Sequence, residues 1–170
     1  MDITQLILDD HEQQRRLFAT LDETPRDDAG ALGAVWERLA TFLEVHAKAE
    51  EELFYPPLLE LGHGATDADS AEEETEDAIG DHNSIREAIA EAGRHEIGSD
   101  AWWEAVESAR RANSTHMAEE ERQGLADFRQ NADADLRHQL GVRFSAFLAE
   151  HADGVEARDL DPDEYVAEHG

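Results

Sequence analysis

Two short stretches of the chain carry the same arrangement of a histidine followed four residues later by a glutamate. His46 precedes Glu50 and His116 precedes Glu120, each within a segment whose apolar residues recur with helical periodicity. Residues four positions apart in an α-helix lie about 40° apart on one face. An imidazole and a carboxylate placed in this way can bind the same metal ion. The fold must therefore place two such His–Glu pairs on helix faces that point into the core.

The apolar pattern predicts five helices joined by short polar loops. They are expected over residues 2–21, 32–54 with a continuation over 58–61 beyond Pro56-Pro57, 71–92, 100–130 and 136–148. Asp2, Ser99 or Asp100, and Asp133 or Asp135 are the expected N-caps. No segment alternates as a strand does, so the sequence predicts an all-α fold, an up-down-up-down four-helix bundle with an additional C-terminal helix.

The chain divides into one expected domain and an acidic C-terminal segment. The domain covers residues 1–152, a length that can bury a core. Residues 153–170 are acidic and show little periodicity, so they are expected to form a loose tail.

Six ionisable side chains occupy positions that should face the bundle core. They are His11, His46, Glu50, His82, His116 and Glu120. The two halves of the chain share one pattern, because His11 precedes His46 by 35 residues and His82 precedes His116 by 34. Burying such groups without charge partners costs several kcal/mol each, a penalty that metal coordination removes. Imidazole with carboxylate suits iron, manganese or zinc, and bridging carboxylates suit a pair of ions.

Three further carboxylates adjoin the predicted ligands. Glu119 lies about 60° from His116 on the other side, so helix geometry alone leaves it open as a ligand. The first stretch has Ala49 at the equivalent position, which favours Glu120. Glu51 and Glu121 lie about 140° from the histidine of their own stretch and are expected to face solvent.

The remaining candidates are assigned to the core or the surface. Tyr55 lies close to the predicted ligands and is expected chiefly to pack in the core. The other histidines join no paired carboxylate on an inward stripe and are expected at the surface; they are His63, His95, His138, His151 and His169.

The chain is strongly acidic, with a formal net charge of −28. Self-repulsion on this scale destabilises the compact state unless salt screens it. We therefore expect a protein adapted to high salt, whose melting temperature rises from low to multimolar KCl. A melting temperature independent of salt would contradict this hypothesis.

The same charge excludes several partners. It repels nucleic acid and anionic membranes. The chain has no cysteine, so disulfides, thiolate metal sites and a cysteine nucleophile are excluded. The N-terminus lacks the pattern of a signal peptide and no apolar run approaches 18 residues, so a soluble, cytoplasmic protein is expected.

With its duplicated histidine and His-x3-Glu set, the chain resembles the hemerythrin-like HHE cation-binding domain family over about residues 1–150. The segment Leu53-Phe54-Tyr55-Pro56 is also similar to the family's aromatic-proline ending. The resemblance implies a four-helix bundle with a non-haem di-iron centre. Glu50 and Glu120 would bridge the two iron ions. The terminal ligands would be His11, His46, His82 and His116.

The chain departs from oxygen-carrying hemerythrins at the third and fourth helices. Those proteins carry a second histidine one turn away on the third helix and an aspartate five residues after the fourth-helix histidine. Here Ala78 and Arg86 flank His82, and Glu120 replaces the aspartate. One iron would then have fewer protein ligands and more room for oxygen, nitric oxide or another small ligand. This departure favours sensing, iron handling or redox chemistry over oxygen transport.

The resemblance leads to one expected function and two alternatives. The expected function is a di-iron protein that binds or senses oxygen or nitric oxide, or that handles iron. An enzyme that reduces peroxide or nitric oxide is less favoured, because the sequence shows no acid, base or substrate pocket for it. The alternative from a different class is a non-catalytic interaction bundle with a degenerate or zinc-filled site.

Overall fold

All regular structure in the described part of the chain is α-helical. The computed structural model describes residues 1–64 and 70–170. Its helices are α1 (Ile3–Glu23), α2 (Ala29–Leu53), α3 (Tyr55–Leu61), α4 (Ala71–Ala92), α5 (Asp100–Arg122), α6 (Gly124–Asn131), α7 (Ala134–Glu150) and α8 (Pro162–His169). The prediction of an all-α fold is confirmed.

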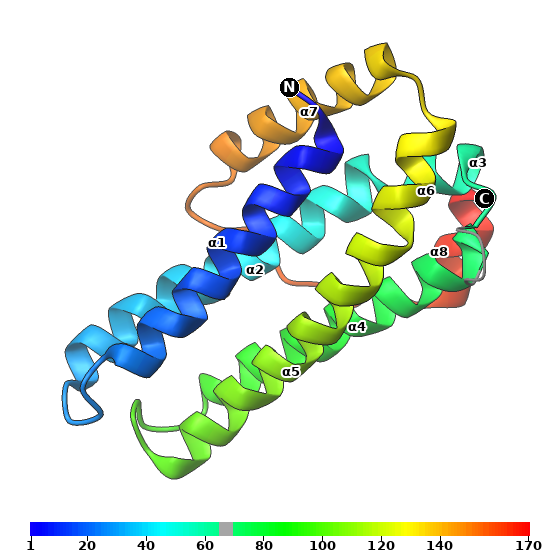
Figure 1. Ribbon diagram of the computed structural model, residues 1–170. Helices are drawn as coiled ribbons and strands as arrows, with labels where there is room; N and C mark the ends of the chain where they lie inside the picture. The colour runs from blue at the N-terminus through cyan, green and yellow to red at the C-terminus, as the bar shows by residue number, and fades with distance from the viewer. Residues whose placement is uncertain (65–69) are drawn as a thin grey trace.

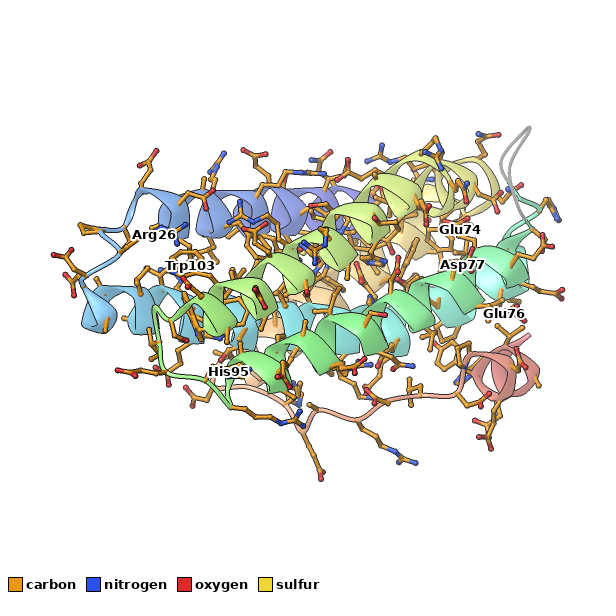
Figure 2. All side chains as sticks on the ribbon, turned by 90° about the horizontal axis from the view of Figure 1, so that it is seen from below. Arg26, Glu74, Glu76, Asp77, His95 and Trp103 are labelled. Atoms are coloured by element: carbon orange, nitrogen blue, oxygen red, sulfur yellow. The ribbon has the colours of Figure 1, made fainter. Side chains whose placement is uncertain are left out.

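Helices α1, α2, α4 and α5 run up and down in succession and form two helical hairpins (Figure 1). The short helices α3 and α6 extend α2 and α5 beyond a break, and α7 packs against α1 and α2. At the loop end of the bundle, the Arg26 guanidinium lies 4.4 Å from the centre of the Trp103 ring, which links the α1–α2 loop to the start of α5 (Figure 2).

Side-chain caps set the starts of most of the helices. Helices α1, α2, α4, α5, α7 and α8 begin after Asp2, Asp28, Ser70, Ser99, Asp133 and Asp161, and each cap accepts a hydrogen bond from a first-turn N–H group. The structure thus selects Ser99 and Asp133 from the two pairs of predicted caps. Helix α4 spans the predicted residues, and Ser70 with Glu73 forms a capping box at its start. Of the loop predicted before α4, residues 65–69 lie outside the described ranges.

The fourth predicted helix is interrupted, so the expectation of one helix over 100–130 is wrong. The backbone leaves helical geometry at Gln123, with φ −110° and ψ −80°, and α6 begins at Gly124. A Cβ atom on Gly124 would lie 2.3 Å from a carboxylate oxygen of Glu74 and 3.3 Å from Leu58. The glycine therefore permits the close approach of α3 and α4 at this break.

Two apolar clusters lie on either side of the predicted polar residues. One cluster gathers Ile3, Ile7, Phe54, Leu58 and Phe128 toward α3 and α6. The other gathers Leu17, Leu39, Trp36, Trp102 and Val106 toward the hairpin loops. The bundle therefore has a polar layer between two apolar regions that shield it from water along the bundle axis.

The C-terminal segment is ordered against the bundle, so the expectation of a loose tail over 153–170 is wrong. Tyr165 of α8 is buried, and its hydroxyl donates a hydrogen bond to the backbone carbonyl of Glu51. The side chain of Asn83 binds both the carbonyl and the N–H of Leu160, at 2.7 and 3.1 Å. A helix of eight residues with one buried aromatic ring has too little periodicity to be recognised from sequence.

Among the described residues, no helix combines the length and apolar character that crossing a bilayer requires.

Candidate metal centre

The six predicted ligands come from four helices and lie together in the polar layer. His11 comes from α1, His46 and Glu50 from α2, His82 from α4, and His116 and Glu120 from α5. Each is at most 3% exposed. The helical phase inferred from the apolar stripes is therefore correct for all six side chains.

The carboxylate of Glu50 lies at the centre of the four imidazoles. Its Oε1 atom is 2.8 Å from His46 Nε2 and 3.9 Å from His11 Nε2. Its Oε2 atom is 3.3 Å from His82 Nε2 and 3.7 Å from His116 Nε2. All four histidines thus direct the same ring nitrogen toward one carboxylate.

The second carboxylate, Glu120, completes the cluster from α5. Its Oε2 atom lies 3.3 Å from His11 Nε2, and its Oε1 atom accepts a 2.9 Å hydrogen bond from the Tyr55 hydroxyl. Tyr55 is buried as expected, but it also contacts the site through this hydroxyl. Ligand atoms of His11, Glu50, His116 and Glu120 lie within 4.8 Å of one another, an arrangement that could hold a metal ion.

Several buried polar atoms at the centre lie close to one another without forming a hydrogen bond of good geometry within the described structure. They are His11 Nε2, His46 Nε2, both carboxylate oxygens of Glu50, and Glu120 Oε2. In addition, the Nε2 atoms of His82 and His116 face each other at 3.3 Å. Ligands about 2.1 Å from one cation lie roughly 3 Å apart when they are adjacent in its coordination shell, which is close to these separations. The donor set and its unsatisfied atoms therefore fit a bound metal.

The expectation that Glu51 and Glu121 face solvent is wrong. Glu51 Oε1 lies 3.0 Å from His82 Nδ1, and Glu121 Oε1 lies 2.9 Å from His11 Nδ1. The angle of about 140° from the histidine of the same helix describes positions on that helix alone. A side chain on the flank of one helix meets the neighbouring helix, and each glutamate there reaches a histidine of the opposite hairpin.

A third carboxylate engages His46 in the same way. Asp10 Oδ2 lies 3.1 Å from His46 Nδ1. An ionised carboxylate can only accept, so the proton of each neutral imidazole with such a partner is on Nδ1. The lone pair of Nε2 is then free to bind a cation, as in carboxylate–histidine–metal arrangements.

The electrostatics of the cluster favour charged groups despite their burial. Burial alone would lower the pKa of His82, but Glu50 and Glu51 outweigh it and raise this pKa to about 9. Burial also opposes charge on His46, yet Glu50 and Asp10 raise its pKa well above the ordinary value. The pKa of Glu50 is in turn well below its usual range, because the imidazoles outweigh its burial. The centre is thus an environment in which carboxylates remain ionised and attract positive charge.

The other sequence candidates lie outside this centre. Glu119 is only half-buried, whereas Glu120 is 2% exposed and contacts His11, so the geometry favours Glu120 as the ligand. His63, His138 and His169 are exposed, as expected. The two others, His95 and His151, are half-buried and bind a glutamate or a carbonyl of their own helix or turn.

Comparisons with known proteins match the chain to a family model and to a solved fold. The family model described as the Hemerythrin HHE cation binding domain matches residues 2–126. A crystal structure of a hemerythrin HHE cation-binding domain-containing protein from Mycobacterium kansasii is similar in fold, with a TM-score of 0.73, 16% identity, and 98% of each chain covered. Among curated proteins, none matches the sequence.

Proposed function

Because the chain belongs to the hemerythrin HHE cation-binding domain family, we propose that its buried cluster holds two non-haem iron ions. Glu50 and Glu120 would bridge the ions. The four histidines, His11, His46, His82 and His116, would be the terminal ligands.

One observation carries this proposal. Four imidazole Nε2 atoms from four helices converge on Glu50, and one of them also faces Glu120. Several of these facing oxygens and ring nitrogens have no hydrogen-bond partner among the described residues. Two bridging carboxylates with histidine ligands are typical of paired metal ions in helical bundles. When bound, iron would supply redox chemistry and affinity for small ligands.

We further propose that the centre binds or senses oxygen or nitric oxide, or handles iron. Ala78 lies one turn before His82, and together with His116 and Glu120 it lines a small cavity beside the cluster. The methyl group of Ala78 supplies no ligand, and the cavity beside it has room for about one water-sized molecule, so a small ligand could reach the ions from this side. If the protein is an enzyme, the same open side of the centre would be where peroxide or nitric oxide is reduced.

Metal analysis combined with an optical spectrum tests this proposal. Protein purified with iron is expected to hold two iron ions per chain and to show the near-UV absorption of an oxo-bridged pair. Titration of the reduced protein with nitric oxide should then change the visible spectrum. Zinc alone or no metal at all would contradict the proposal and favour the alternative, a helical interaction bundle.

A further inference from the structure

The internal repeat of the chain extends beyond the six candidate ligands. The first half contains Asp10-His11-x3-Arg15 and His46-x3-Glu50-Glu51, and the second contains Asp81-His82-x3-Arg86 and His116-x3-Glu120-Glu121. An arginine thus lies one turn after the isolated histidine of each half. A second glutamate directly follows the candidate bridging glutamate of each half.

In one half of the site these residues form what we name the inner pair, Glu51 and Arg86. Glu51 extends from α2 to α4, where its Oε1 atom lies 3.0 Å from His82 Nδ1 and accepts a hydrogen bond from Arg86. The side chains of Glu51 and Arg86 are only 2% and 6% exposed.

The other half contains the equivalent outer pair, Glu121 and Arg15. Glu121 extends from α5 to α1, where its Oε1 atom lies 2.9 Å from His11 Nδ1 and 2.7 Å from Arg15 Nη2. Here the side chains are 29% and 43% exposed. Both pairs connect a glutamate to the histidine and arginine of the other hairpin. The inner pair joins α2 to α4 and is buried, whereas the outer pair joins α5 to α1 and is partly exposed.

We propose that the inner and outer pairs are positioning groups for the metal site, an inference that rests on the proposed metal-binding function. Each glutamate holds the proton of its histidine on Nδ1 and orients Nε2 toward the cations. His82 and His11 are thus each oriented by the hairpin that does not carry them. The site is therefore complete only when the α1–α2 and α4–α5 hairpins are docked.

The arginines have a separate task in this arrangement. Glu51 lies next to Glu50 in sequence and carries a negative charge beside the centre, so without a counter-charge it would repel Glu50 and compete for the cations. Arg86 supplies that counter-charge and holds the carboxylate on the outer side of His82. Arg86 thus has a specific role at one of the two positions flanking His82, 78 and 86, where an oxygen carrier would have its second histidine.

Alanine and glutamine variants of the two glutamates test this proposal, with metal affinity as the readout. Glu51→Ala and Glu121→Ala should each weaken Fe(II) binding roughly 10- to 100-fold in competition with a chelator, as for other outer-shell partners of metal ligands. Glu51→Gln and Glu121→Gln should restore part of the affinity, because an amide oxygen still accepts the Nδ1 proton. The Co(II) absorption spectrum of the alanine variants should also change, since a reoriented imidazole alters the coordination.

Neighbouring residues provide matched controls. Glu52→Ala removes a carboxylate whose contact is with Lys48 at 3.3 Å, and Arg16→Met removes an arginine whose contact is with Glu12 at 3.1 Å. Both controls should bind Fe(II) as the unmodified protein does, whereas Arg15→Met should bind it more weakly.

Folding and function can be separated in this experiment. If Glu51→Ala does not fold, the double variant Glu51→Ala/Arg86→Met takes its place, because it also removes the buried arginine charge that has lost its glutamate. The Glu121 variants give an independent measurement of metal affinity, since Glu121 is partly exposed. Unchanged affinity and an unchanged Co(II) spectrum in folded alanine variants would overturn the positioning role. Failure of the unmodified protein to bind metal would overturn the proposed function instead.

Discussion

Replacement of Glu50 with alanine is expected to abolish binding of both metal ions. This carboxylate lies between 2.8 and 3.9 Å from the Nε2 atoms of all four candidate histidine ligands, so its removal takes away a contact that all four share. The loss should exceed the roughly 100-fold upper range for outer-shell partners. Metal content after gel filtration and binding titration with Fe(II) would measure it.

Variants of single histidines test whether iron loss is specific to the candidate ligands. His46→Ala should also remove most bound iron, because it deletes a terminal ligand. His138→Ala is the control, since His138 is exposed and its contact is with the backbone carbonyl of Met1. Full retention of iron by folded Glu50→Ala and His46→Ala proteins would contradict the ligand assignment.

Metal loading is expected to raise the stability of the fold by a large amount. A cation that binds the native but not the unfolded chain at a thousand times its dissociation constant stabilises the protein by about 4 kcal/mol. For a chain of this size, that corresponds to a rise of roughly 8–16 °C in melting temperature. Thermal unfolding of metal-free and iron-loaded protein, followed by circular dichroism, measures the difference.

The Glu50→Ala variant again supplies the control, because it should unfold at the same temperature with and without iron. Equal melting temperatures for the two forms of the unmodified protein, at a concentration where iron is bound, would contradict a role of the metal in joining the helices.

Much of the fold and the core of the site could be predicted because both depend on local rules. The caps at Asp2, Ser99 and Asp133 and the helical phase of the apolar stripes are properties of short segments. The inward direction of the six candidate ligands follows from the same phase. These features need no knowledge of how the helices pack.

The features that could not be predicted depend on packing between helices. Glu51 and Glu121 lie on the flanks of their own helices, and only the placement of the opposite hairpin shows that each reaches a histidine. The close packing at Gly124, next to the break at Gln123, depends on the approach of Glu74 from α4. Similarly, α8 is held against the bundle by Tyr165, whose hydroxyl donates a hydrogen bond to the backbone carbonyl of Glu51 in α2.

Arg86 illustrates how a comparison with oxygen carriers can mislead at a single position. Against that pattern Arg86, like Ala78, is a position where a ligand is missing. In the internal repeat it is the counterpart of Arg15, and both bind the glutamate of the opposite half. The repeat was visible in the sequence, and a search for residues that recur around each histidine would have found it.

The unequal exposure of the two Glu–Arg pairs makes the two halves of the site respond differently to ionic strength. Dissolved ions screen the outer pair, whose side chains are 29% and 43% exposed, but not the inner pair at 2% and 6%. Salt that relieves the repulsion of a chain with a net charge of −28 would at the same time loosen His11 relative to His82. The proposed centre would then become unequal as salt rises, with weaker metal binding on the side of His11.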